Sequence, residues 1–474
     1  KIERKNKFTK IEGLDPANNS GGPKSFNCTL ILCEGLSAKT YAVAGIQKGV
    51  NNKKGRDWFG IYALRGKLLN VRNSSVTSIA KNNVISDLIK SIGLRQNVDY
   101  TIEKNFKTLR YGQIMLMTDA DVDGIHIEGL LINLFHFLFP SLLDRKEQFL
   151  VSMKTPIVRV FGKTKKHKDK LFYDERNFKK WSDNQTNKFK AKYYKGLGTT
   201  RPEDVPDTFG IKMVEYFKDE LANININKVF NKRFSDERKK WLAEFNINNS
   251  ISLDDTNENY KMDMTDFVNN ELIKFSINDC KRSIPNGIDG LKESQRKIIY
   301  AVKKRNLKYS GKSLKVQQLG GYVAEHTNYH HGEGNLYDTI VKLANEFPGT
   351  NNIPLLYRDG MFGTRLEGGK DAASPRYIFT KMESLTPLIY RDEDDVLLEK
   401  VIDDGDEVEP KFYVPILPMI LINGSTGIGT GWSTEIPCFN PKDIIANIFN
   451  IINNKDYIEL IPYYRGFTGT IEKI

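Results

Sequence analysis

A short apolar segment that runs into three acids constrains this chain more than any other feature. Residues 113–117 (QIMLM) have strand character, 119–124 (DADVDG) follow as a turn, and 125–139 (IHIEGLLINLFHFLF) are long and apolar enough for a buried helix. A similar pair precedes it, with a strand at 29–33 (TLILC) and a helix at 37–50 (SAKTYAVAGIQKGV). Strands that alternate with helices predict a parallel sheet with functional groups at the carboxyl ends of its strands.

Four carboxylates stand at those two strand ends. Glu34 follows the first strand, and Asp119, Asp121 and Asp123 alternate after the second. Acids that converge on one point repel one another, and a hard divalent cation relieves the repulsion. An isolated acidic turn would be interpreted as solvated, and an EF-hand loop would need Glu where Leu130 stands. The additional Glu34 at the same sheet edge favours a metal site.

Composition limits the class of protein. A chain of 474 residues predicts two to four domains. No apolar run reaches the ~20 residues that span a bilayer, and the first ten residues do not resemble a signal peptide. We therefore expect a soluble intracellular protein that does not enter a membrane. The net charge of +12 suggests a polyanionic partner. The four cysteines form no CxxC pair, and we expect Cys28 and Cys33 to be packing residues on opposite faces of a strand.

The second half of the chain is helical and then glycine-rich. Helical segments from about residue 266 lead into the Gly-rich stretch 359–382, an order that resembles a helix-turn-helix with a β wing. Tyr377 follows Arg376 in this stretch, which also contains Arg365 and Lys370. A phenol with a pKa of about 10 needs nearby cations or a base to attack phosphorus. Further candidates for that role are Arg296 and the histidines of EHTNYHHGEG. The acidic run 391–410 is expected to be a solvated linker or face.

Eight ordered motifs resemble the type IIA DNA topoisomerases of the eukaryotic kind, which large DNA viruses also carry. They are TLILCEGLSAKTYAV, YALRGKLLNVR, MLMTDADVDGIHI, YYKGLGT, SIPNGIDGLKESQRKIIYA, YHHGEGNL, FGTRLEGGKDAASPRYIFT and PILPMILINGSTGIGTGWSTEIP. The resemblance implies an α/β plus α+β chain: a Toprim domain with a Rossmann-like parallel sheet, a winged-helix domain and the start of a tower domain. We expect boundaries at 1–150 (Toprim), 151–265 (its remainder and connector), 266–390 (winged helix) and 391–474 (partial tower).

The same resemblance implies roles for individual residues. Tyr377 would form a 5′-phosphotyrosyl bond with help from Arg376, while Arg296 and His331 match an active-site cation and histidine. Glu34, Asp119 and Asp121 would hold one Mg²⁺, and Asp121 and Asp123 a second. Ile428 would wedge between base pairs. The remaining expected contacts are with DNA (Arg65, Lys67, His330 and Lys370) and with an ATPase domain (Lys195).

The resemblance also implies partners and limits. The substrate would be double-stranded DNA and the protein a homodimer, in the nucleus if cellular and in host cytoplasm or a viral factory if viral. ATP would be hydrolysed by a separate N-terminal domain that we expect to be absent here. Leu36 and Ala63 depart from the family's usual Asp and Pro, which predicts altered sensitivity to cleavage poisons. A Toprim nuclease or primase, or a scaffold with a degenerate site, are the alternatives.

Overall fold

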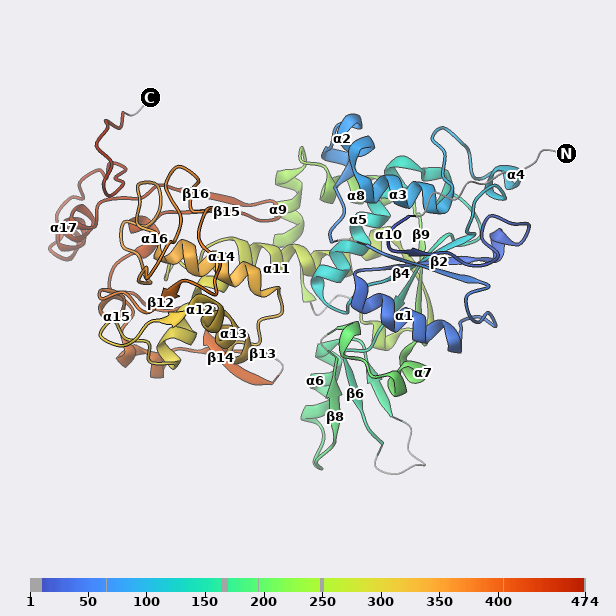
Figure 1. Ribbon diagram of the computed structural model, residues 1–474, viewed down its shortest axis with the longest axis horizontal. Helices are drawn as coiled ribbons and strands as arrows, with labels where there is room; N and C mark the ends of the chain where they lie inside the picture. Colours follow the sequence, from blue (N-terminus) through green and yellow to red (C-terminus); the bar gives the residue numbers. More distant parts are fainter. Residues whose placement is uncertain are drawn as a thin grey trace. The chain divides into compact units, whose positions relative to one another are not determined.

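The chain divides into two compact units. The computed structural model describes residues 11–64, 66–162, 169–194, 196–247, 251–403 and 405–472, so Arg65 and Lys195 lie outside the described residues. The units are Lys1–Ile277 and Asn278–Ile474, and Figure 1 follows the chain through them in colour. Among the described helices, none is long and apolar enough to cross a membrane.

A seven-stranded sheet organises the first unit. Its order is β1 (Leu14–Asp15), β3 (Phe59–Ala63), β2 (Thr29–Cys33), β4 (Gln113–Met117), β5 (Leu150–Lys154), β9 (Lys212–Phe217) and β10 (Asn259–Asp263). The four central strands are parallel, as predicted. The sheet as a whole is mixed, because β1 runs antiparallel to β3 and β9 antiparallel to β5. The expectation of a purely parallel sheet is wrong there, because β9 follows a small antiparallel sheet instead of a direct crossover helix.

Helices cover both faces of this sheet. Residues of β2 alternate between two apolar clusters, with Leu30 and Leu32 on one face and Ile31 and Cys33 on the other. Helix α1 (Leu36–Lys48) packs on the second face, and α3 (Asn83–Ile92) and α5 (Val122–Leu138) pack on the first (Figure 1). Cys28 belongs to the first cluster and Cys33 to the second, which confirms that both are packing residues on opposite faces. Sheet and helices together hold the ends of β2 and β4 in place.

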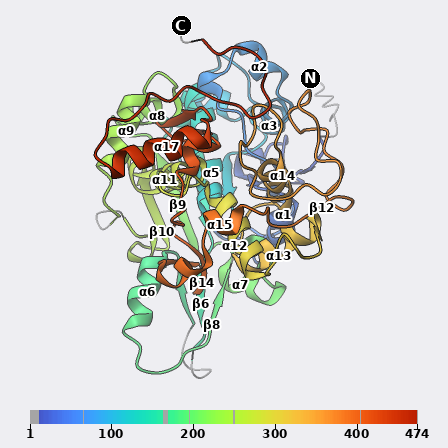
Figure 2. The same ribbon diagram turned by 90° about the vertical axis from the view of Figure 1, so that its left-hand side faces the viewer.

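The remainder of the first unit is a small sheet and several helices. The small sheet has the order β7 (Lys170–Phe172), β6 (Val158–Val160), β8 (Ala191–Tyr193). It carries α6 (Glu175–Asp183) and forms a lobe at one end of the unit in both Figure 1 and Figure 2. The principal remaining elements are α2 (Val76–Lys81), α4 (Glu103–Phe106), α7 (Val205–Thr208), α8 (Ala222–Phe230), α9 (Ser235–Ala243), α10 (Met264–Asp266) and a π-helix (Phe267–Leu272).

The second unit is built on three packed helices. They are α12 (Glu293–Lys304), α13 (Val316–His326) and α14 (Glu333–Ala344), preceded by α11 (Ile273–Ser283), which crosses the unit boundary. Strand β11 (Leu314–Lys315) pairs with β12 (Phe379–Thr380) at the base of the Gly-rich stretch. The predicted helices and β wing are therefore present. The chain continues through α15 (Thr386–Ile389), α16 (Met419–Ile422), the hairpin β15 (Ser425–Ile428) with β16 (Ser433–Ile436), and α17 (Pro441–Ile452).

The acidic run is only partly the solvated segment that we expected. Its first part is exposed, but it continues into a hairpin of β13 (Lys400–Asp403) and β14 (Asp406–Pro410) whose last three residues are buried. Glu409 is 2% exposed and pairs with the equally buried Lys297. A composition-based interpretation missed this carboxylate because its partner is 112 residues away in the sequence.

Candidate active site

The four acids of the first unit gather at one edge of the seven-stranded sheet. Strands β2 and β4 pair in parallel with Cys33 opposite Met117, so Glu34 and the residues after Thr118 meet at the same edge. The backbone N–H of Asp119 donates to Glu34 Oε2 at 3.1 Å. Asp121 caps α5 by accepting from the N–H of Gly124 at 2.7 Å. The sheet edge thus brings the predicted residues together.

Close backbone packing defines the turn that bears the acids. A Cβ on Gly124 would stand 2.2 Å from the carbonyl oxygen of Asp119 and 3.1 Å from Thr118 Cβ. Only glycine lets the first turn of α5 lie so near the end of β4. The glycine that ends the DADVDG motif is therefore required by the turn.

Electrostatic repulsion at this edge is visible in Glu34. Burial raises the pKa of its carboxyl to about 7, the hydrogen bond from Asp119 opposes the shift, and the negative charges of Asp119, Asp121 and Asp123 add to it. Burial also raises the pKa of Asp119, opposed by a hydrogen bond from the N–H of Leu197. Oxygen-only donors that repel one another are the ligand set that a hard divalent cation prefers.

Each acid is nevertheless held by a partner within the protein. Asp123 pairs with Lys67 at 2.5 Å, and the Lys67 ammonium also lies 4.8 Å from the centre of the Phe275 ring. Within the described ranges, no three His, Cys, Asp or Glu side chains are grouped as closely as ligands of one metal ion. The donor chemistry of the edge fits Mg²⁺, and its carboxylates would have to turn toward the ion.

The YYKGLGT motif contributes something that the sequence did not indicate. Leu197 N–H donates to Asp119 Oδ1 at 2.7 Å, and a Cβ on Gly196 would stand 2.9 Å from Asp119 Oδ2. This segment therefore buttresses a predicted metal ligand. Two glycines flanking an apolar residue were the available signal, but nothing local indicated that Asp119 lay opposite them.

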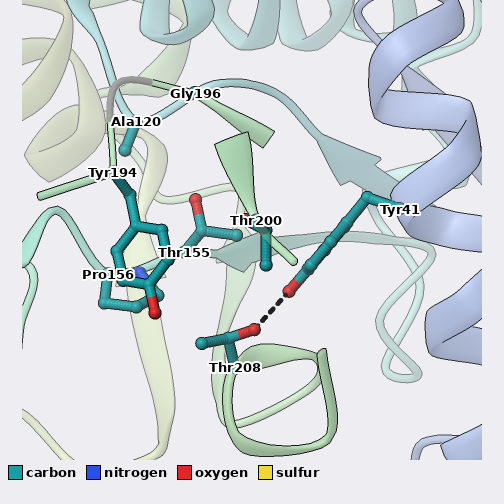
Figure 3. A pocket seen from close by; sticks show the side chains of 8 residues that line it. All are labelled: Tyr41, Ala120, Thr155, Pro156, Tyr194, Gly196, Thr200 and Thr208. Carbon is teal, nitrogen blue, oxygen red and sulfur yellow. Dashed lines mark hydrogen bonds between the residues drawn. The ribbon is translucent and has the colours of Figure 1, made fainter. Parts of the chain in front are cut away.

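A small pocket beside this contact is too narrow for a substrate. Ala120 and Gly196 line it together with residues from α1 and α7, where Tyr41 and Thr208 share a hydrogen bond of 3.0 Å (Figure 3). Its volume of about 10 Å³ has room for no more than one water molecule. The chemistry of the first unit is therefore confined to the open acidic edge.

In the second unit, Tyr377 presents its ring to solvent. It is 69% exposed, and the guanidinium of Arg376 lies 5.8 Å from its ring centre. Its neighbour Ile378 is 1% exposed, and the Ile378 carbonyl accepts from the N–H of Val316 at 3.0 Å. The buried isoleucine and this hydrogen bond at the start of α13 anchor the segment, so the adjacent phenol is directed outward. Lys370 is exposed in the same Gly-rich stretch.

Arg296 lies in an environment unlike that of an exposed phosphate ligand. It is 8% exposed, and its guanidinium donates twice to Asp289, at 2.6 and 3.1 Å, and once to the carbonyl of Leu291. Asp289 is fully buried and also accepts from the N–H of Tyr413. The arginine therefore fixes the turn before α12 from inside.

The two predicted histidines each have a charged neighbour. His331 Nε2 lies 3.3 Å from Arg282, which the sequence had not singled out, and His330 Nε2 lies 3.3 Å from Asp403 of the β13–β14 hairpin. Ile428 stands at the end of β15 and is 82% exposed. Such exposure of an isoleucine at a hairpin fits an apolar wedge.

Three protein families match the chain in succession. Residues 29–152 match the Toprim domain, 153–280 the C-terminal associated domain of Toprim, and 282–474 the A-type family of DNA gyrase/topoisomerase IV. The chain is 49% identical to DNA topoisomerase 2 of Invertebrate iridescent virus 6, over 98% of this chain and 42% of that protein. It is 45% identical to DNA topoisomerase 2-alpha of Homo sapiens, over 99% of this chain and 31% of that protein.

A solved structure agrees with these relatives. It is the crystal structure of the Plasmodium falciparum topoisomerase II DNA-binding, cleavage and re-ligation domain, 42% identical, with a TM-score of 0.78. The alignment covers 98% of this chain and 62% of that one. The chain thus spans less than half the length of the curated relatives that it matches.

Proposed function

Since this chain belongs to the type II DNA topoisomerase family, we propose that it cleaves and rejoins double-stranded DNA through Tyr377. The observation that carries this proposal is the exposed Tyr377 phenol beside Arg376. The remaining tyrosine contacts in this part of the chain are packing contacts, such as the buried Tyr390 against Tyr413. An exposed phenol next to a guanidinium is suited to attack on a phosphodiester.

The covalent step exchanges one phosphate ester for another. The phenolic oxygen of Tyr377 bonds to the scissile phosphorus, and the bond from phosphorus to the 3′-oxygen breaks. The phenol proton leaves to water, and the departing 3′-oxygen takes up a proton. Attack by that 3′-hydroxyl reverses the step and rejoins the strand. Arg376 stabilises the charge on the phosphate oxygens in both directions.

The acidic edge would supply the divalent cation. Toprim domains of topoisomerases are associated with Mg²⁺. Here Glu34, Asp119 and Asp121 would hold one ion, and Asp121 and Asp123 a second. When bound, the ion supplies positive charge to the scissile phosphate and the leaving oxygen. Lys67 would release Asp123 as that carboxylate turns to the metal.

Arg296 and His331 act at different levels in this proposal. Arg296 positions the turn before α12 through Asp289, and His331 with Arg282 faces the phosphate backbone. Ile428 bends the duplex by insertion, and His330, Lys370 and Arg65 contact DNA. Lys195 would meet the ATPase domain of the whole protein. The protein would act as a homodimer, because each chain brings one Tyr377 and a double-strand break needs two.

Trapping the covalent intermediate tests this proposal. End-labelled duplex DNA is incubated with the protein and Mg²⁺, quenched with denaturant and extracted with phenol. Wild type should carry label into the protein phase, and Tyr377→Phe should not. Tyr309→Phe is the matched control, because Tyr309 is also exposed and lies 4.9 Å from the ammonium of Lys381. Magnesium-dependent cleavage with free DNA ends in the wild type would instead indicate a Toprim nuclease.

A further inference from the structure

One buried carboxylate lies directly beneath the acidic edge. Glu128, in the second turn of α5, is 1% exposed. Its Oε1 accepts from Thr118 Oγ1 at 3.1 Å and from Ser152 Oγ at 2.6 Å. Its Oε2 accepts from Tyr216 at 2.9 Å and from the ammonium of Lys154. The single side chain therefore joins α5 to β4, β5 and β9.

The four donors explain how this charge is tolerated. An isolated carboxylate taken out of water is strongly destabilising, and it persists only with an opposite charge and saturated hydrogen bonds. Lys154 supplies the opposite charge, and two donors reach each oxygen. Because Glu128 is neutralised in this way, it does not add a fifth uncompensated negative charge to the edge above it.

The bond to Thr118 has a special place in the chain. Thr118 is the residue immediately before Asp119, and Glu128 lies on the helix that follows the acidic turn. Their hydrogen bond therefore closes the base of the loop that presents Asp119 and Asp121. Repulsion among the acids favours an open loop, and this contact ties the end of β4 to α5 against it.

We propose that Glu128 is a positioning residue for the divalent-cation site, holding the β4–α5 turn through Thr118 so that its carboxylates converge. This inference rests on the proposed function of the acidic edge. Lys154 lines a cleft of about 400 Å³ that Asp119 and Asp121 also line. Glu128 thus also keeps the lysine ammonium from pairing with those acids in place of a metal ion.

Two single-hydroxyl deletions test the positioning role. Thr118→Val and Tyr216→Phe each remove one hydrogen bond to Glu128, the first at the acidic turn and the second on the far strand β9. Binding of Mn²⁺ to the DNA-free protein is measured by electron paramagnetic resonance, and thermal melting reports the stability of each variant. Loss of a contact that orients metal ligands weakens affinity by about tenfold or more. Thr118→Val should show this loss, whereas Tyr216→Phe should stay within about twofold of wild type despite a similar loss of stability.

The outcomes separate this inference from the proposed function. Equal Mn²⁺ affinities in wild type and both variants, or equal losses in the two variants, would overturn the positioning role alone. A wild-type protein that binds no Mn²⁺ would overturn the metal assignment and this inference with it. The double variant Glu128→Leu with Lys154→Leu removes the buried charges together, so a folded protein with weakened Mn²⁺ binding would support the inference independently.

Discussion

Lys297 Nζ lies 2.9 Å from a carboxylate oxygen of Glu409, with the two side chains only 5% and 3% exposed. Lys297 also donates to the carbonyl of Thr327 at 2.9 Å. The pair thereby ties α12 to β14 and to the turn that leads to His330 and His331. Two distant segments, one basic and one acidic in composition, form a single buried contact in the second unit.

Removing one member of this pair should destabilise the second unit strongly. Lys297→Met leaves the Glu409 carboxylate buried without a counter-charge, which costs about 3–5 kcal/mol. The double variant Lys297→Met with Glu409→Leu should recover most of that loss, because neither charge remains. Lys400→Met is the control, since its pair with Glu407 is exposed and contributes about 0–1 kcal/mol. Denaturant unfolding measures all four proteins, and a single variant as stable as wild type would contradict the argument.

Arg296→Lys should act through stability before it acts on chemistry. Lysine cannot make the paired contacts with Asp289, so a buried carboxylate loses at least one charged hydrogen bond, worth about 1.5–3 kcal/mol. The melting temperature should fall, and cleavage at a temperature where the variant is folded should be reduced only modestly. A variant with unchanged melting but abolished cleavage would instead place the guanidinium on the phosphate.

Gly196→Ala should weaken divalent-cation binding. The new methyl group would stand 2.9 Å from Asp119 Oδ2 and displace a carboxylate that also accepts from Leu197 N–H. We expect about a tenfold rise in the Mg²⁺ concentration for half-maximal cleavage. Gly198→Ala is the comparison in the same turn, because its Cβ meets only the side chain of Ser37 at 3.3 Å. Identical Mg²⁺ dependence in both variants would refute a role for Gly196 in placing Asp119.

His136 should make the first unit less stable in acid. Burial lowers its pKa to about 4, and the positive charges of Arg72 and Lys218 contribute, opposed by the negative charge of Asp144. Arg72 donates to His136 Nδ1 at 2.6 Å, so the native imidazole is neutral. The unfolded chain takes up a proton near pH 6.5 and the native chain does not until about pH 4. The free energy of unfolding should therefore fall between these values, by on the order of 3 kcal/mol in total.

A histidine replacement isolates that contribution. His136→Gln keeps an acceptor for Arg72 but cannot titrate. The difference in unfolding free energy between wild type and variant should change across pH 6.5 to 4.5 in the direction of lower wild-type stability. A difference that stays constant over this range would show that His136 is not responsible.

Local sequence was sufficient to predict the main elements of both units. Apolar runs predicted β2 and β4, and the acidic turn between β4 and α5 predicted where the candidate ligands gather. These features are readable because strand and helix periods, and the charge of adjacent residues, act over a few positions. The ordered motifs likewise indicated the family before any contact was known.

What the tertiary structure alone decided concerns contacts between segments far apart in the chain. Glu128 reads as one polar position in an apolar helix, and its four donors come from strands up to 88 residues away. Arg296 reads as an exposed cation until Asp289 is seen to enclose it, and the support that Gly196 and Leu197 give to Asp119 spans 78 residues. Charge and spacing determine which groups a chain carries. Only packing decides which of them lose water, and hence which carboxylates must be paired and which remain available to a metal ion.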